Sequence, residues 1–249
     1  APQLERARRQ LRRNGTALAI LLLHVLYLGV GLADSLHLRS PALGRGEVVS
    51  MLDLGLWKLR ENTEKTYSAP LSLYAYTRES RPGADGSVSR EFPRLRHAAP
   101  ALGDPAAHSG HLLRLGGFGA AAGGMVWLGL ALGLCWRLAR KHSVNASAAA
   151  VLLLRGRTET AWRALLVTAA LLCVGIGVVA ALATQYHVLG TDKVGQDVRY
   201  LSLKAVRTGL IIGALTLVIM LPLAGILGIA AGYFGGWVDD LIQYLYTTL

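Results

Sequence analysis

Four long apolar runs limit what this chain can fold into. A helix needs roughly 20 predominantly apolar residues to cross the hydrocarbon core of a bilayer. Runs of about that length occur at Thr16–Ala33, Leu115–Trp136, Ala164–Thr184 and Gly209–Ala231. Because backbone in lipid must satisfy its own hydrogen bonds, these runs predict membrane-spanning helices. The expected fold class is therefore an all-α integral membrane protein, a polytopic helical bundle.

Composition agrees with a membrane location. Hydrophobic residues make up 53% of the chain and charged residues only 16%, whereas soluble domains carry about 25% charged residues. The net charge of +11 comes largely from arginines beside the apolar runs, as the positive-inside rule expects, and this argues against nucleic acid as the partner. Cys135 and Cys173 lie inside apolar runs and predict neither a disulfide framework nor a metal site.

Two basic clusters predict which segments of the chain face the cytoplasm. Five arginines precede the first run, and six basic residues lie between the second and third runs, so both segments are expected in the cytoplasm. A signal peptide is the alternative for the N-terminus. The expected division is a basic cytoplasmic N-terminus (1–15), a span (16–33), an extracytoplasmic insertion (34–114), a span (115–136), a basic cytoplasmic segment (137–163), a span (164–184), an external loop with an interfacial helix (185–208), a span (209–231), and a cytoplasmic hairpin with the start of another span (232–249).

The insertion is expected to be a small α+β or irregular unit. Its pattern predicts a helix within 46–66, a strand at Leu71–Thr77, a turn at Arg81–Gly86 and irregular chain over 93–110. On the cytoplasmic side, Ala146–Leu154 is expected to form a short amphipathic helix in the interface.

A polar loop leads into the fourth run. Gly190 and Gly195 permit backbone conformations that other residues resist. Asp197 precedes an amphipathic stretch and is expected to cap a helix over 198–207. His187 has Asp192 close by in sequence, but no nucleophile accompanies them, so no catalytic residue is expected. The candidates for a substrate pathway or gate are Gly190, Thr191, Asp192, Gly195, Asp197, Arg207 and Pro222.

The fourth run carries packing and turn signals. Pro222 removes a backbone donor and is expected to kink the helix. Small residues at helical spacing predict close packing against another helix, at Gly225, Gly228 and Gly232. An interfacial hairpin is expected next, with its aromatic, glycine and acidic residues at Tyr233, Phe234, Gly235, Gly236, Trp237 and Asp239.

These two motifs, in this order and at this distance, resemble the start of the core domain in permease subunits of dipeptide and oligopeptide ABC importers. The matching positions are His187, Leu189, Gly190, Thr191, Asp192, Gly195, Asp197, Val198, Arg207 and Ala231–Asp239. Val188 stands where the family has proline, and Gln196 where it has arginine. The resemblance covers about residues 163–249 and does not extend to 1–162.

The resemblance implies a subunit of the type I ABC importer kind in a bacterial inner membrane, of which this chain is expected to be the N-terminal part. It implies a second permease subunit, ATP-binding subunits and an extracytoplasmic substrate-binding protein as partners, beside the lipid bilayer. ATP would be hydrolysed by the partner subunits, so neither a cofactor nor a metal is expected in this chain. The family handles dipeptides, oligopeptides, nickel and antibiotic-like peptides, and the spans do not identify the cargo.

Two other functions compete with transport. The unmatched first half motivates a membrane-anchored sensor or scaffold that acts through residues 34–114. A membrane-embedded enzyme lacks support, because no run carries paired carboxylates or a nucleophile–base pair. His108 and His111 have a ligand-like spacing but no third ligand, and His24 lies inside the first span, where a packed neutral histidine is the competing interpretation.

Overall fold

Helices make up most of the described chain, and four of them are long and apolar enough to cross a membrane. The computed structural model describes residues 2–39, 48–82, 88–100, 102–143, 145–154 and 160–248. The long helices are α2 (Gly15–Ser35), α5 (His108–His142), α7 (Trp162–Leu182) and α8 (Val198–Phe234). The shorter ones are α1 (Pro2–Arg13), α3 (Met51–Gly55), α4 (Trp57–Glu61), η2 (Pro105–Ala107, a 3₁₀ turn), α6 (Ala146–Leu154) and α9 (Gly236–Thr248). The expectation of a helical membrane protein is confirmed.

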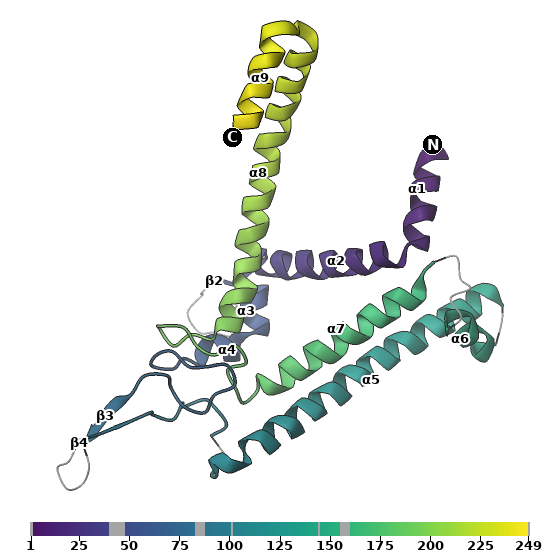
Figure 1. The fold of residues 1–249 in the computed structure, drawn as a ribbon. Coiled ribbons are helices and arrows are strands. Elements are labelled where there is room, and N and C mark those ends of the chain that lie inside the picture. Colours follow the sequence, from purple (N-terminus) through teal and green to yellow (C-terminus); the bar gives the residue numbers. More distant parts are fainter. Residues whose placement is uncertain are drawn as a thin grey trace.

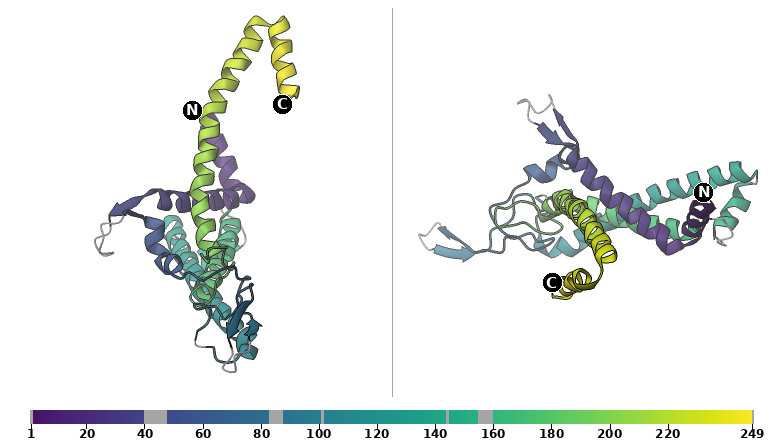
Figure 2. Two further views of the ribbon diagram at one scale, coloured as in Figure 1. Left: turned by 90° about the vertical axis from the view of Figure 1, so that its left-hand side faces the viewer. Right: turned by 90° about the horizontal axis from the view of Figure 1, so that it is seen from above.

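The long helices of the described chain cross one another at different angles. Helices α5 and α7 pack along their length as an antiparallel pair, whereas α2 runs across α8 and contacts only the first third of it (Figure 1). Among the described helices, α9 packs beside the rest of α8, which extends away from the other long helices (Figures 1 and 2). Lipid tails are as apolar as leucine, so apolar helices associate only where small or polar residues favour close contact.

Glycines supply that close contact between α5 and α7. A Cβ on Gly123 would lie 2.2 Å from the carbonyl oxygen of Cys173, and one on Gly119 would lie 2.4 Å from that of Gly177. The Trp127 indole N–H adds a hydrogen bond of 2.9 Å to the Leu166 carbonyl oxygen. The two backbones therefore touch in a way that any larger side chain at these glycines would prevent.

Helix α8 differs from the expected interfacial helix followed by a separate span. It runs without a break from Val198 through Pro222 to Phe234. No helix end lies near residue 208, where Val206 and Leu210 pack on α2 against Gly31. A proline removes one backbone donor, and a membrane helix tolerates that loss.

The insertion is mixed, as expected, but its elements are not the expected ones. Strand β1 (His37–Arg39) pairs antiparallel with β2 (Val48–Ser50), and β3 (Glu79–Pro82) with β4 (Val88–Glu91). The single helix predicted within 46–66 is wrong: from 48 onward, β2 is followed by the one-turn helices α3 and α4. The reason is a capping box, in which the Ser50 hydroxyl accepts from the Asp53 N–H and the Asp53 carboxylate accepts from the Ser50 N–H.

The strand predicted over Leu71–Thr77 is also wrong. This stretch forms only isolated bridges, Ser68 with Ala75 and Tyr74 with Arg94. Its alternation instead buries Leu73 and Ala75 in the hydrophobic core of the insertion. Leu95, Ala98, Ala99 and Tyr186 complete that core.

Three expected turns and irregular stretches lie between the longer elements. The turn predicted at Arg81–Gly86 falls largely on residues 83–87, outside the described residues. The irregular stretch expected over 93–110 ends earlier, because η2 begins at Pro105 and α5 at His108. The expected hairpin at 232–239 is a helix–helix turn at Gly235 and Gly236, which have φ of +57° and +53°.

Candidate functional site

The polar loop 185–197 is built by its own hydrogen bonds. Asp192 Oδ1 accepts from the backbone N–H groups of Val194 and Gln196, both at 2.9 Å. The Asp192 N–H donates to the Gln196 carbonyl at 2.9 Å. Asp197 Oδ1 accepts from the Arg199 N–H at 2.9 Å and so caps α8. The loop therefore fixes the point at which α8 begins.

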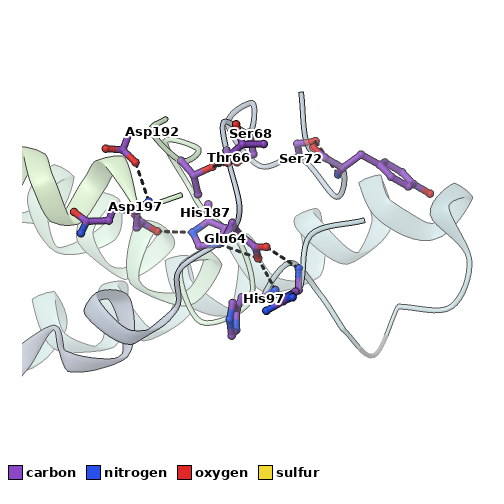
Figure 3. Close-up of polar contacts among 12 residues, drawn as sticks. Glu64, Thr66, Ser68, Ser72, His97, His187, Asp192 and Asp197 are labelled. Carbon is purple, nitrogen blue, oxygen red and sulfur yellow. Dashed lines mark hydrogen bonds and ion pairs between the residues drawn. The ribbon is translucent and has the colours of Figure 1, made fainter. Parts of the chain in front are cut away.

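This loop packs against residues 62–75 of the insertion, and we call the two segments together the loop junction (Figure 3). The Glu64 N–H donates to the Gly195 carbonyl at 2.8 Å, and the Leu71 N–H donates to the His187 carbonyl at 3.0 Å. The Thr191 hydroxyl donates to the Thr66 carbonyl at 2.8 Å. The insertion and the loop are thus held together by backbone and side-chain hydrogen bonds.

Two glycines make the close approach possible. Gly190 has φ of +76° and Gly195 has φ of +80°, in the left-handed region that favours glycine. A Cβ on Gly190 would lie 2.2 Å from the Ser68 carbonyl oxygen, and one on Gly195 would lie 1.9 Å from that of Glu64. Both positions therefore require glycine for conformation and for space.

A buried histidine lies between two carboxylates at the centre of the loop junction (Figure 3). His187 Nδ1 is 2.9 Å from Asp197 Oδ2, and His187 Nε2 is 3.6 Å from Glu64 Oε1. The side chains of His187, Asp197 and Glu64 are 4%, 1% and 3% exposed. The contact with Asp197 has hydrogen-bond geometry, whereas His187 Nε2 has no hydrogen-bond partner among the described residues.

The same carboxylate of Glu64 holds a third segment. Its two oxygens accept from the backbone N–H groups of Arg96 at 3.0 Å and His97 at 2.7 Å. Glu64 therefore connects the chain around residue 96 to the loop before α8. These hydrogen bonds hold three segments of the chain together.

A second polar cluster ties α3 to α8 and to the end of α2. The Tyr200 hydroxyl donates to Asp53 Oδ1 at 2.7 Å, and Lys204 Nζ lies 3.0 Å from the same oxygen. Burial raises the pKa of Asp53, but hydrogen bonds from Tyr200, Lys204 and Ser50 outweigh it and lower the pKa to about 2. Asp34, 2% exposed, has its Oδ1 3.9 Å from Lys204 Nζ. The Lys204 ammonium group thus lies within 4 Å of two buried carboxylates, those of Asp53 and Asp34.

The two histidines with ligand-like spacing face a tyrosine. His111 Nδ1 is 2.8 Å from the Tyr186 hydroxyl oxygen, and His108 Nδ1 is 3.4 Å from it. Burial raises the pKa of Tyr186, an effect that nearby Arg94 partly offsets. Among the described residues, no group of three metal-ligating side chains is found.

The structure brings together only some of the residues proposed from the sequence. Gly190, Thr191, Asp192, Gly195 and Asp197 all lie in the loop junction, but the partner of His187 is Asp197, not the nearer-in-sequence Asp192. Asp192 is instead used to fold the loop itself, because its side chain faces the N–H groups of residues 194 and 196.

The remaining proposed residues lie on α8 and α9, away from the loop junction. Arg207 and Pro222 are within α8. A Cβ on Gly225, Gly228 or Gly232 would meet nothing within 4 Å, so these glycines face open space in the described chain. At the helix–helix turn, Tyr233 and Phe234 stack edge to face at 5.0 Å, Trp237 is exposed, and Asp239 accepts from Gln243 at 3.2 Å.

The sequence missed the residues that reach the site from the insertion. Glu64 and Thr66 have no local pattern that marks them, because their partners lie far along the chain. Asp53 belongs to the local Ser50–Asp53 capping pattern, which gives no sign of its contact with Tyr200. Asp34 and Lys204 did carry a signal. Each is a charged residue near an apolar run, where an ionisable side chain needs a partner.

Comparison with known proteins gives a partial match. A 63-residue part of the chain is 35% identical to the oligopeptide transport system permease protein OppC of Mycobacterium bovis and of Mycobacterium tuberculosis strains CDC 1551 / Oshkosh and H37Rv. The match covers 25% of this chain and 22% of each relative. No family model and no solved structure matches the chain. The chain is a helical membrane protein, a quarter of which is similar to a transport permease.

Proposed function

We propose that the chain belongs to a permease subunit of an ABC importer, which moves peptides or similar small solutes across the bacterial inner membrane. Partner subunits hydrolyse the ATP, and an extracytoplasmic binding protein delivers the solute. The observation that carries this proposal is the likeness of a 63-residue part to oligopeptide permeases, together with the four apolar helices.

The loop junction is proposed to lie on the outer side, near the mouth of the pathway. It joins the insertion to the start of α8 through His187, Glu64 and Asp197. A change of position in the insertion would therefore reach α8 directly. In this proposal Gly190, Thr191 and Gly195 keep the two segments in contact and Asp192 folds the loop, and none of them binds solute.

Exposed aromatic side chains beside the loop junction support a docking role for the insertion. Tyr67, Tyr74, Tyr76 and Phe92 are 49%, 40%, 75% and 47% exposed. The Tyr76 N–H donates to the Tyr67 carbonyl at 2.9 Å, so these two belong to one folded surface. Tyrosine and phenylalanine are enriched at protein interfaces. A sensor acting through an independent insertion is less well supported, because the insertion shares its core residue Tyr186 with the loop before α8.

Deletion of the gene in its source bacterium tests transport. Uptake of a labelled peptide should fall to background and return when the full-length gene is supplied. An ATPase subunit should co-purify with the full-length protein. Normal peptide uptake in the deletion strain, with no redundant importer present, would contradict the proposal.

Site-specific crosslinking tests docking separately. A photoreactive amino acid at Tyr76 of the full-length protein should crosslink to the binding protein in cells, whereas the same amino acid at exposed Arg39, in β1, should not. Equal crosslinking from both positions would remove the docking role while leaving transport untouched.

A further inference from the structure

Helix α1 is a short amphipathic helix with a strong positive charge. Leu4, Ala7 and Leu11 recur at three- and four-residue spacing and form an apolar row on one side. Leu4 is 68% exposed and Leu11 is 43% exposed, so nothing in the described chain covers this row. The rest of the helix carries five arginines and one acid, at Arg6, Arg8, Arg9, Arg12, Arg13 and Glu5.

The direction of α1 is fixed by its connection to the long helices. Asn14 ends α1 and caps α2, since its side chain accepts from the Ala17 N–H at 3.2 Å. The Ala161 N–H donates to the Arg12 carbonyl at 2.8 Å and holds the end of α1 against the start of α7. Both views show α1 running crosswise to α2 (Figures 1 and 2). Helix α1 is therefore not a continuation of α2, and its apolar row stays exposed.

More positive charge lies at the same end of the α5–α7 pair. The last turns of α5 carry exposed Arg137, Arg140 and Lys141, and the start of α7 carries exposed Arg163. The Arg140 guanidinium lies 4.1 Å from the ring centre of Trp136. Tryptophan and arginine together are typical of the headgroup region of a membrane.

We propose that α1 is a membrane-surface anchor that binds anionic phospholipid headgroups. The apolar row enters the boundary between headgroups and acyl chains, and the arginines that flank it bind the lipid phosphates. A phosphate surface fits this charge, and the exposed apolar row distinguishes a lipid surface from a nucleic acid. The arginines of α1 and the basic ends of α5 and α7 then share one layer of headgroups.

A fluorophore on the apolar row tests this in bilayers of known composition. A polarity-sensitive dye is attached at Leu4→Cys in the full-length protein, with Cys135→Ala and Cys173→Ala to remove other thiols. The protein is placed in nanodiscs of phosphatidylcholine alone or of equal parts phosphatidylcholine and phosphatidylglycerol. We expect several-fold less quenching by acrylamide in the anionic discs. A dye at Gln10→Cys, off the apolar row, should remain quenchable in both.

A matched pair of charge variants identifies the cause. Arg8→Gln with Arg12→Gln removes two arginines beside the apolar row and leaves three others to keep the orientation of the helix. Because each basic side chain near an anionic surface contributes about fivefold in affinity, dye protection should need a much larger fraction of phosphatidylglycerol. The control, Arg39→Gln with Arg90→Gln, removes two exposed arginines from the insertion and should change nothing.

Two results would overturn the proposal. One is equal protection of the Leu4 dye in zwitterionic and anionic discs. The other is a phosphatidylglycerol dependence that the α1 double variant and the insertion control alter to the same extent. Neither result bears on transport, which is measured by peptide uptake.

Discussion

At the scale of single residues, the central feature is one imidazole between two buried carboxylates. The sequence pointed to His187 and Asp197 but gave each a separate role, and their contact appears only when the loop folds on itself. Glu64 could not be predicted, since a segment far along the chain brings it to within 3.6 Å of His187. Local pattern predicts turns and caps, whereas contacts between distant segments depend on the tertiary fold.

Removing the imidazole should destabilise the loop junction. His187→Ala would leave the buried Asp197 Oδ2 without its hydrogen-bond partner, and such an unsatisfied buried group costs about 1–3 kcal/mol. We expect a clearly lower midpoint of thermal unfolding in detergent. His37→Ala, an exposed histidine in β1, is the control and should leave the midpoint unchanged. A His187→Ala midpoint equal to that of the control would show that the pairing contributes nothing.

Asp53 should make stability depend on acidic pH. Its folded pKa of about 2 lies below the ordinary value of 3.8, so the folded state favours the charged form. The stabilisation is therefore complete above pH 4 and is lost as the pH falls toward 2. It amounts to about 2 kcal/mol, at roughly 1.4 kcal/mol per pKa unit.

The measurement is the unfolding midpoint of the wild type and two variants across that range of pH. Asp53→Asn should lower the midpoint at neutral pH and flatten its decline below pH 4. Asp104→Asn removes an exposed carboxylate and should keep the wild-type slope. An unchanged slope in Asp53→Asn would mean that other carboxylates control the acid sensitivity.

At the scale of elements, the long helices were the most predictable part. Their apolar length alone located them, and α7 (Trp162–Leu182) lies close to the expected span at 164–184. The short elements of the insertion were not predictable in the same way. The Ser50–Asp53 capping box starts a helix of only five residues. The alternating side chains of Leu73 and Ala75 pack into the core of the insertion, although their backbone is not part of a named strand.

Two glycines of α5, one packed against α7 and one exposed, test whether helix packing requires glycine. Gly123→Ala would place a Cβ 2.2 Å from the Cys173 carbonyl oxygen, so α5 and α7 would have to move apart. Gly129→Ala meets nothing within 4 Å and should, if anything, stabilise α5 by about 1 kcal/mol or less. Thermal unfolding of both variants checks this. A loss of stability in Gly129→Ala equal to that in Gly123→Ala would contradict the packing that the structure shows.

At the scale of the whole molecule, the arrangement predicts which segments are reached from each side of the membrane. In a background without Cys135 and Cys173, an impermeant maleimide should label Tyr76→Cys on intact cells. Lys141→Cys, at the end of α5, should be labelled only after the cells are made permeable. Labelling of both positions on intact cells would contradict the proposed cytoplasmic location of the basic segment 137–163.

The unbroken length of α8 has a mechanical consequence. Its 37 residues extend about 55 Å at 1.5 Å per residue, whereas the hydrocarbon core of a bilayer is about 30 Å thick. One end is clamped by Asp197, Tyr200 and Lys204, and the other reaches Gly235 without another described helix except α9 beside it. If the insertion tilted a rod of this length at the end that it holds, the far end would move sideways by a much larger distance.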